Sequence, residues 1–384
     1  MKRTADVVII GAGAVGAACA YFAARAGLSA QVVDRGQIVG GTTGACEGNV
    51  LVSDKEAGPE LDLSLYSQQV WRADLAEFGA LWEFESKGGL VVAASAAGAQ
   101  ALRELAVRQR AAGIEVTDVA ATDIRTYEPH IRTELAAGAF YPQDAQVQPM
   151  LMAAQLLRLA RASGATVTPH TRVTGFERDG EAVTGVRTDR GTIHAAAVVN
   201  AAGTWAGEIA QLARVHVPVL PRRGFVLVTE PLPPTIRHKV YAGEYVANVL
   251  SSDEALQTSP VIEGTRGGTV LIGSSRERVG FDRTVSLPVL RELAANAVAL
   301  FPALKQVRVM RSYLGFRPYC PDHLPVLGPD PRAPGLWHAS GHEGAGIGLS
   351  VGTAKLITQS ITGKPVDLDI SPFAPERFDE VTHA

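Results

Sequence analysis

The chain has 384 residues, 46% of them hydrophobic, with 36 basic and 39 acidic side chains and a formal net charge of −3. This length suffices for a large core and about two domains, and the hydrophobic content excludes an intrinsically disordered protein. The near balance of charge, without a basic run, gives no electrostatic basis for binding nucleic acid or an anionic membrane surface.

The cysteines and the N-terminal residues indicate the cellular compartment that we expect for the protein. Cys19, Cys46 and Cys320 are far apart and form no CxxC pair. This spacing argues against a disulfide framework or a zinc ribbon and favours a reducing cytoplasm. The start, MKRTADVVIIGAGAVG, has a basic residue before an apolar run, but Asp6 and three glycines interrupt it, so we interpret it as mature sequence rather than a signal peptide. No apolar run approaches the roughly 18 residues of a membrane span.

The first forty residues have the order of a dinucleotide-binding unit. ADVVII (5–10) predicts a buried parallel strand, and Gly11, Gly13 and Gly16 follow it in GxGxxG spacing. An apolar helix that ends at a glycine comes next, and a second strand, SAQVVD, ends at Asp34.

Each residue type in this order has a physical role. Gly11 makes the tight turn, Gly13 lets the backbone approach a pyrophosphate, and Gly16 lets the helix pack closely on the strand. The N–H groups at the start of the helix face the phosphate charge. Asp34 accepts hydrogen bonds from a ribose hydroxyl, and a carboxylate here favours an unphosphorylated ribose. The pattern predicts dinucleotide binding and leaves NAD and FAD open.

Further glycine-rich segments lie later in the chain. The loop GGTTGACEGN (40–49) directly follows the second strand, and Thr42 and Thr43 can wrap a ligand there, with a solvent loop as the alternative. Residues 168–206 alternate apolar and polar side chains between turns, which predicts a β-meander ending in a buried strand. Residues 335–357 predict a strand, a glycine turn and a helix.

A second kind of structure interrupts this unit. LWEFESKGGLVVAAS (81–95) predicts a hairpin across its KGG turn. Residues 221–230 and 258–277 predict an antiparallel sheet followed by a helix. We therefore expect the dinucleotide fold to resume after an antiparallel excursion.

Four segments occur in order along the chain: VVIIGAGAVGAACAYFAARAG…VVD, TRVTGF, VVNAAGTWA and GFRPYCPDHLPVLGP…GLWHASGHEGAGIGLSVGTA. Together they resemble the D-amino-acid oxidase, glycine oxidase and sarcosine oxidase family of FAD-dependent amine oxidoreductases, nearly end to end. The resemblance implies FAD as the cofactor. It also implies an α/β fold, with a Rossmann-like FAD-binding domain that has a parallel sheet and a β-meander, and an α+β substrate domain on an antiparallel sheet.

The implied domains are discontinuous. Residues 1–80, 140–215 and 325–384 are expected to form the FAD-binding domain. Residues 81–139 and 216–324 are expected to form the substrate-binding domain.

The resemblance also implies which residues hold FAD. Asp34 and the glycine turn would bind the ADP half, and Thr42 and Thr43 would meet the pyrophosphate. The loop 341–349 would border the flavin, with a helix N-terminus toward the N1/C2=O edge, where reduced flavin carries negative charge. The implied cofactor-binding residues are Gly11, Gly13, Ala14, Val15, Gly16, Asp34, Arg35, Thr42, Thr43, Gly48, Asn49, Val173, Ala202, Gly203, Gly344, Gly346, Ile347, Gly348 and Leu349.

On the substrate side, Arg317 of GFRPYC falls at the family's arginine for the substrate carboxylate. A guanidinium pairs with a carboxylate through two hydrogen bonds and so orients it. Tyr241, Tyr245 and His342 are further candidates. The implied reaction oxidises the C–N bond of a small amino or imino acid, such as a D-amino acid, glycine, an N-methyl amino acid or a proline analogue. A hydride passes to flavin N5, and the imine product is hydrolysed.

The chain departs from the family in ways that bear on cofactor and acceptor. Gly315 occupies the position of the cysteine that attaches flavin covalently in some members, which implies noncovalent FAD. Leu271 is placed where some oxidases have a lysine over N5, which favours a dehydrogenase, while oxygen and another electron acceptor both stay open. GTTGACEGNVLVSDKE resembles catalytic subunits of multisubunit imino- and amino-acid dehydrogenases, so partner subunits stay open too.

Other functions have weaker support. A flavin-binding subunit that only relays electrons or has a structural role is the main alternative, but Arg317 implies a substrate. An NAD-only dehydrogenase would not need the VVNAAG and SGHEGAGIG segments.

Two local patterns suggest other chemistries. GLSVG matches the GxSxG of serine hydrolases, and Ser350, Asp367 and His383 have the hydrolase order. A nucleophile elbow requires a strand running directly into the serine, whereas Ser350 is expected inside a helix. His338 and His342 have metal-ligand spacing, but the glycine between them keeps them off a shared helical face, so no metal site is predicted.

Overall fold

The structure is a computed structural model that describes residues 3–243 and 251–378. Its first sheet has the strand order β17 (Val326–Pro329), β18 (Leu336–Ser340), β11 (Gly191–Asn200), β1 (Thr4–Ile10), β2 (Ala30–Val33) and β8 (Thr166–Thr168), extended from β11 by β10 (Ala182–Thr188) and β9 (Val173–Asp179). The strands from β18 to β8 run parallel, whereas β17 and the β9–β10–β11 meander pair antiparallel. The predicted parallel sheet with a meander is confirmed.

The two faces of β1 explain its unbroken apolar run. Val7 and Ile9 pack in one core with the helices, while Val8 and Ile10 pack in another with the meander. Because neighbouring side chains on a strand point to opposite faces, a strand covered on both sides is apolar throughout. The helices of this part are α1 (Ala14–Arg25), α2 (Pro59–Gln69), α5 (Pro149–Ala162), α6 (Ala206–Leu212) and α9 (Gly346–Ile361).

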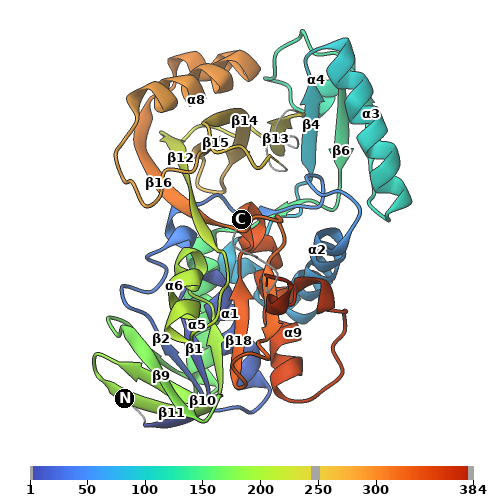
Figure 1. Ribbon diagram of the computed structural model, residues 1–384. Coiled ribbons are helices and arrows are strands. Elements are labelled where there is room, and N and C mark those ends of the chain that lie inside the picture. The colour runs from blue at the N-terminus through green and yellow to red at the C-terminus, as the bar shows by residue number, and fades with distance from the viewer. Residues whose placement is uncertain (1–2, 244–250, 379–384) are drawn as a thin grey trace.

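The second sheet is mainly antiparallel. Its order is β16 (Val309–Tyr319), β12 (Leu220–Thr229), β15 (Val270–Arg276), β14 (Gln257–Gly264), β13 (Lys239–Ala242), β4 (Gly89–Ala93), β6 (Ala137–Tyr141) and β5 (Thr117–Ala120). Among the described strands of this second sheet, only β13 and β4 pair in parallel. Its helices are α3 (Ala96–Ala111), α4 (Ile124–Tyr127) and α8 (Leu287–Leu300). In Figure 1 this sheet, with α8 on one side and α3 on the other, occupies the upper part of the molecule above the first sheet.

The predicted hairpin over residues 81–95 is wrong. Trp82 ends a helical turn and is fully buried beside Trp71 in the core of the first sheet, whereas β4 begins at Gly89 in the second sheet. β4 pairs with β6 and β13, both distant in sequence. The KGG segment therefore carries the chain from one sheet to the other, and nonlocal pairing decides the partners of β4.

Short elements connect the two sheets. A two-stranded ribbon joins β3 (Asn49–Val50) to β7 (Ala145–Gln146). The short helical turns are η1 (Thr42–Ala45), η2 (Val70–Asp74), η3 (Ala76–Trp82), η4 (Gly203–Trp205), η5 (Pro302–Gln306), η6 (Glu343–Ala345), η7 (Ser371–Phe373) and η8 (Pro375–Phe378). Within the described ranges, none of the helices is long and apolar enough to cross a membrane. β6 runs across the expected domain boundary after residue 139, and the domain limits stay a prediction.

Candidate active site

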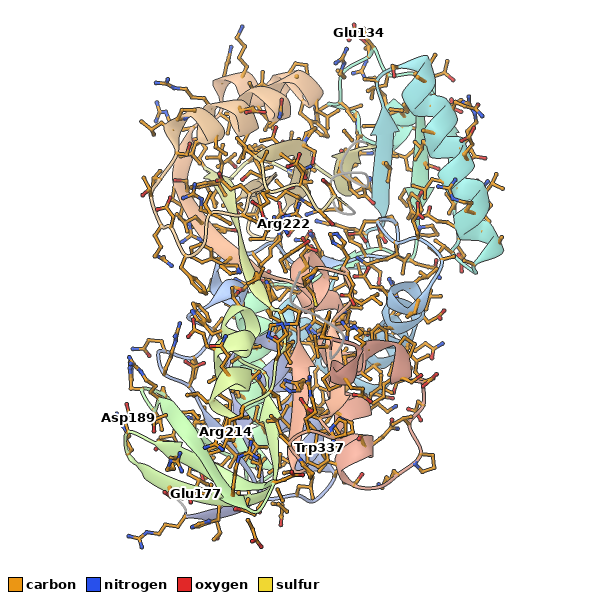
Figure 2. The ribbon with its side chains drawn as sticks, in the orientation of Figure 1. Glu134, Glu177, Asp189, Arg214, Arg222 and Trp337 are labelled. Atoms are coloured by element: carbon orange, nitrogen blue, oxygen red, sulfur yellow. The ribbon has the colours of Figure 1, made fainter. Side chains whose placement is uncertain are left out.

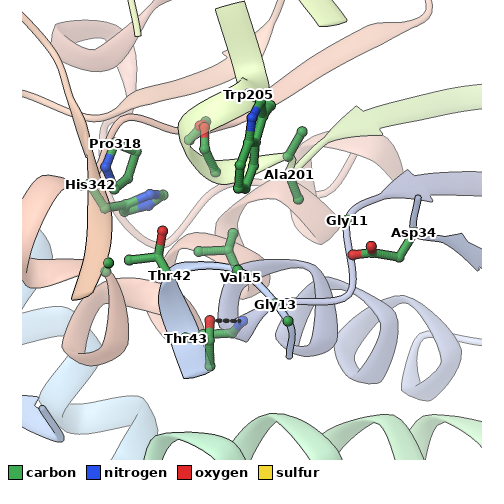
Figure 3. Close-up of a pocket in the computed structure, with 18 of the residues that line it drawn as sticks. Gly11, Gly13, Val15, Asp34, Thr42, Thr43, Ala201, Trp205, Pro318 and His342 are labelled. Atoms are coloured by element: carbon green, nitrogen blue, oxygen red, sulfur yellow. Dashed lines mark hydrogen bonds between the residues drawn. The ribbon is translucent and has the colours of Figure 1, made fainter. Parts of the chain in front are cut away.

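One large cavity lies where the two sheets meet. Its volume is about 860 Å³, within the range of roughly 300–1,000 Å³ that is usual for cofactor and ligand sites. Its wall includes the carboxyl ends of β1, β2, β11 and β18 and parts of β12 and β16 from the second sheet. Figure 3 shows the part of this wall formed by the glycine turn, Thr42, Thr43, Trp205 and His342.

The glycine turn holds α1 against β1 without side chains. Gly11 has a φ of 111°, and a Cβ on it would lie 2.4 Å from the carbonyl oxygen of Ala201. A Cβ on Gly16 would lie 1.9 Å from the carbonyl oxygen of Gly11. The N–H of Ala14 donates to Thr43 Oγ1 at 3.0 Å, which ties the second glycine-rich loop to the start of α1 (Figure 3). The backbone of this turn is thus open to a ligand.

Asp34 lies at the end of β2 and lines the cavity. Its Oδ2 accepts from the N–H of Ala12 and its Oδ1 from the N–H of Gly36, both at 2.8 Å. A carboxylate oxygen can accept two hydrogen bonds, so Asp34 retains acceptors for a ligand hydroxyl. Beside it, Arg35 stacks 4.1 Å above the Trp205 ring, which also faces the cavity. Trp205 was missed by the residue-by-residue prediction, although it lies in VVNAAGTWA.

Arg317 reaches the opposite end of the cavity from β16. Its Nη1 donates to the carbonyl oxygen of Ser275 at 2.8 Å. Gly224 on the neighbouring β12 leaves the space for it, because a Cβ there would lie 2.2 Å from Nη1. Gly315 also lines the cavity, and a Cβ on it would lie 2.7 Å from the carbonyl oxygen of Ala45.

A buried ion pair joins the two sheets near Arg317. Arg222 of β12 donates to Glu343 at 2.6 Å, and Figure 2 shows Arg222 between the two parts of the molecule. Burial raises the pKa of Glu343, but the hydrogen bond from His323 and the charges of Arg276 and Arg222 outweigh it and lower the pKa overall. Glu343 is therefore an ionised cavity residue that already has cationic partners.

His342 is a neutral residue of the cavity wall. It is 3% exposed, and its Nε2 lies 3.0 Å from Thr353 Oγ1. Burial lowers the pKa of His342 to about 3, so the imidazole carries no charge near neutral pH.

Most of the residues expected at the cofactor lie in this wall. Those that line the cavity are Gly11, Gly13, Ala14, Val15, Asp34, Arg35, Thr42, Thr43, Asn49, Val173, Ala202, Gly203, Gly344, Gly346 and Ile347, together with Arg317 and His342. Gly16, Gly48, Gly348 and Leu349 do not line the cavity. Gly48, for example, passes so near Val147 that a Cβ would lie 1.7 Å from its carbonyl oxygen.

The expectation that Tyr241 faces the pocket is corrected by the structure. Tyr241 is fully buried in the second sheet, and its hydroxyl bonds to Ser53 Oγ. Pairing of β13 with β4 and β14 turns this side chain into the core. Tyr245 lies outside the described residues. Leu271 does not line the cavity either, so it gives no information about oxygen reactivity.

The other candidate chemistries lack their geometry. Ser350 is fully buried within α9, and its hydroxyl donates to the carbonyl oxygen of Ile347, while His383 lies outside the described residues. His338 bonds to Asp330 on one side and Asn200 on the other. Within the described part of the chain, no three His, Cys, Asp or Glu side chains are grouped so that they could hold a metal ion.

Comparison with known proteins decides the family. The family model described as FAD dependent oxidoreductase (DAO) matches residues 6–360. The chain belongs to the FAD-dependent oxidoreductase family.

Members of the FAD-dependent oxidoreductase family with similar sequences cover nearly the whole chain. It is 30% identical to the hydrogen cyanide synthase subunit HcnC of Pseudomonas aeruginosa, over 98% of this chain and 97% of that protein. It is 28% identical to glycine oxidase of Geobacillus kaustophilus over 98% of each. The crystal structure of glycine oxidase from that organism matches with a TM-score of 0.89 at 27% identity, covering 98% of this chain and 99% of the other. L-proline dehydrogenase from P. horikoshii, at 22% identity, shares the fold with a TM-score of 0.89.

The cavity wall fits the FAD of this family. At one end, the glycine turn, whose close packing leaves no room for side chains, and the carboxylate of Asp34 line the cavity, and these are the groups that meet the pyrophosphate and ribose of a dinucleotide. At the other end, Gly315 and the start of α9 line the wall. The predictions of an FAD-dependent enzyme and of FAD as its cofactor are confirmed.

Proposed function

We propose that this protein oxidises the C–N bond of a small amino or imino acid. The observation that carries the proposal is the guanidinium of Arg317 at the end of the FAD cavity. The glycine-rich loop, Gly315 and the start of α9 meet at the same end. A fixed planar cation at a cavity of this kind suits a carboxylate-bearing substrate.

The residues around Arg317 set what the site does. Bound FAD would supply the two-electron acceptor for a hydride from the carbon next to nitrogen. Arg317 would hold the carboxylate and so orient the C–H bond, while Val226 and Pro318 form apolar wall beside it. His342 is neutral and adds no competing cation. A neutral substrate amine needs no further base, and water hydrolyses the imine product.

We further propose that FAD is held noncovalently. Gly315 offers no nucleophile, and Cys46, the cysteine in the cavity wall, has a thiol pKa raised chiefly by burial. A protonated thiol is a poor nucleophile. Acid precipitation of the purified protein is expected to leave FAD in the supernatant; flavin that stays with the pellet would show a covalent bond.

The relatives support a substrate of this class and leave the electron acceptor to experiment. One relative is named a glycine oxidase, and another is named a subunit of hydrogen cyanide synthase. An electron-relay subunit, the competing function, would make no use of a carboxylate clamp at Arg317.

A screen separates these functions. Purified protein is mixed without oxygen with D- and L-amino acids, N-methyl amino acids and proline analogues, and bleaching of the flavin absorbance is recorded. At least one compound with a carboxylate beside the C–N bond is expected to bleach the flavin. Repeating that case in air distinguishes an oxidase from a dehydrogenase. A flavin that none of these compounds reduces would favour the relay subunit.

A further inference from the structure

Three buried charges lie beside the Arg317 end of the cavity. Lys239 of β13 and Glu263 of β14 are cross-strand partners, and Lys239 Nζ lies 2.7 Å from Glu263 Oε2. Glu47, in the glycine-rich loop, places Oε2 3.6 Å from the same Nζ. Of the three, Glu47 lines the cavity.

The charge of this group is unbalanced. Lys239 and Glu263, each at most 2% exposed, already form a close ion pair. Glu47 adds a second carboxylate that is 9% exposed, so the group has two carboxylates for one ammonium, and the charge of Arg317 also acts on Glu47. A buried charge is costly unless it is matched, so once a ligand carboxylate pairs with Arg317 the group favours a further cation or proton. Burial and the charge of Glu263 raise the pKa of Glu47, while the charges of Lys239 and Arg317 lower it, and the pKa is raised overall.

Hydrogen bonding at Glu47 is incomplete as well. Its Oε2 accepts from Asn49 Nδ2 at 3.5 Å, but its Oε1 is buried without a partner among the described residues. Asn49 Oδ1 is a second buried acceptor without a hydrogen-bond partner among the described residues, and Asn49 also lines the cavity. Gly273 makes room for this carboxylate, because a Cβ there would lie 2.6 Å from Glu47 Oε1. A ligand that carries at least two N–H or O–H donors would satisfy both of these acceptors.

We propose that Glu47 and Asn49 bind the amino group of the substrate whose carboxylate is held by Arg317. The inference rests on the proposed function and adds the second half of the substrate site. An ammonium group carries three N–H donors, and the protonated amine of an imino acid carries two. Its positive charge also balances the second carboxylate in the bound state. Before hydride transfer, one N–H proton of the ammonium would pass to the Glu47 carboxylate, which leaves the neutral amine that the reaction needs. Arg317 and the Glu47 group then present opposite charges to one zwitterion, and the site selects amino carboxylates over plain carboxylates.

An N–H group of the cofactor ring could also donate to Glu47 Oε1 and Asn49 Oδ1 in place of the substrate amine. The test must therefore measure ligand affinity and FAD affinity separately. An amine with no hydrogen on any carbon next to nitrogen cannot lose a hydride there, so its dissociation constant can be read from the change in flavin absorbance. We choose α-aminoisobutyrate with isobutyrate, and 1-aminocyclopentane carboxylate with cyclopentane carboxylate. Within each pair, one member has the amine and the other lacks it.

The variant Glu47→Gln removes the charge and keeps the shape of the side chain. We expect about a 10- to 100-fold weaker affinity for the amine-bearing probe, the scale of a lost charged hydrogen bond, and less than about a twofold change for the plain carboxylate. FAD affinity, measured by fluorescence quenching on reconstitution of the apoprotein, is expected to stay within about twofold. Glu277→Gln is the matched control, because Glu277 pairs with Arg223 in the same part of the molecule but does not line the cavity. It is expected to change none of these constants.

Several results would overturn the inference. Equal weakening of both members of a probe pair, or no change in either, removes Glu47 from the amine site. A loss of FAD affinity with unchanged preference for amines assigns the missing donor to the cofactor. If wild-type protein binds neither member of either pair, the proposed function itself fails. Should Glu47→Gln not fold, Glu47→Asp keeps the charge and is expected to retain most of the amine preference; its complete loss would contradict the role of the carboxylate charge.

Discussion

At Gly16, the addition of a single methyl group is expected to disturb the packing of α1. It lies in the first turn of α1, and a Cβ there would stand 1.9 Å from the carbonyl oxygen of Gly11. The backbone carbonyl cannot move aside as a flexible side chain can. The helix α1 would therefore have to move away from the glycine turn. The N-terminus of α1 would then lose its place in the cavity wall.

We predict that Gly16→Ala lowers the free energy of unfolding by about 1–3 kcal/mol, as overpacking does, and weakens FAD binding. Gly267→Ala is the control, since Gly267 has a single neighbour, Thr265 Oγ1, at 3.9 Å from its added Cβ. Denaturant unfolding and FAD titration measure both effects. A variant at Gly16 as stable as the control would show that the close helix packing is not required.

At the scale of elements, β12 and β16 together determine where Arg317 points. Gly224 faces Gly315 across the two strands, and a Cβ on Gly224 would meet both Arg317 Nη1 at 2.2 Å and the Ser275 carbonyl oxygen at 2.6 Å. The guanidinium thus lies over a glycine of the neighbouring strand. We predict that Gly224→Ala moves Arg317 and weakens isobutyrate binding by about tenfold or more, with FAD still bound. An unchanged isobutyrate affinity would mean that the arginine tolerates displacement or does not bind the carboxylate.

A second group of elements ties the loop after β3 to the second sheet. Asp144 is fully buried and accepts from the N–H groups of Val52 and Ser53 and from the Ser53 hydroxyl, while Tyr241 bonds to the same hydroxyl. Gln109 of α3 donates to the carbonyl oxygens of Ser53 and Lys55. Tyr241 is therefore part of a structural network that positions the loop.

This network predicts a dependence of stability on pH. Burial raises the pKa of Asp144 to about 7, against about 3.9 in the unfolded chain. The folded protein then holds one more proton than the unfolded protein between these values, so stability falls as the pH rises through this window. We expect the difference in unfolding free energy between wild type and Asp144→Asn to shift in favour of the variant between pH 5 and pH 8, by an amount on the order of 3 kcal/mol at most. Parallel stability curves for the two proteins would contradict the raised pKa.

For the whole molecule, one cavity depends on segments from both ends of the chain. The glycine turn of residues 11–16 and the start of α9 belong to the first sheet, while Arg317 comes from the second. Thr42 and Thr204 both donate to the carbonyl oxygen of Phe316, which joins β16 to the first sheet just beside Arg317. The cofactor end and the substrate end are thereby held in one fixed relation.

The way in which distant segments build the cavity explains which residues could be predicted from the sequence and which could not. Gly11 and Asp34 could be predicted in the cavity wall because a tight turn and a ribose each require a particular residue type in a particular local order, whereas Arg317 was predicted from the resemblance of GFRPYC to the family. Tyr241 was placed wrongly, because the face of β13 is decided by its pairing with β4, about 150 residues earlier in the chain. Glu47 was missed for a similar reason. Its ion-pair partner Lys239, and Glu263, which pairs with the same lysine, lie far away in the sequence. The sequence indicated only that the loop GTTGACEGN, which contains Glu47, would lie near the site.

The most direct measurement is steady-state oxidation of the amino acid that the screen identifies, followed with an artificial electron acceptor and compared between wild type and Arg317→Ala. We predict a rise in the Michaelis constant of about 100-fold, the equivalent of roughly 3 kcal/mol for a buried charged hydrogen bond, with FAD content unchanged. Arg317→Lys keeps the charge but loses the planar guanidinium, and its Michaelis constant is expected to lie between those of wild type and Arg317→Ala. A Michaelis constant for Arg317→Ala equal to that of wild type would contradict the assignment of this cavity end to a carboxylate-bearing substrate.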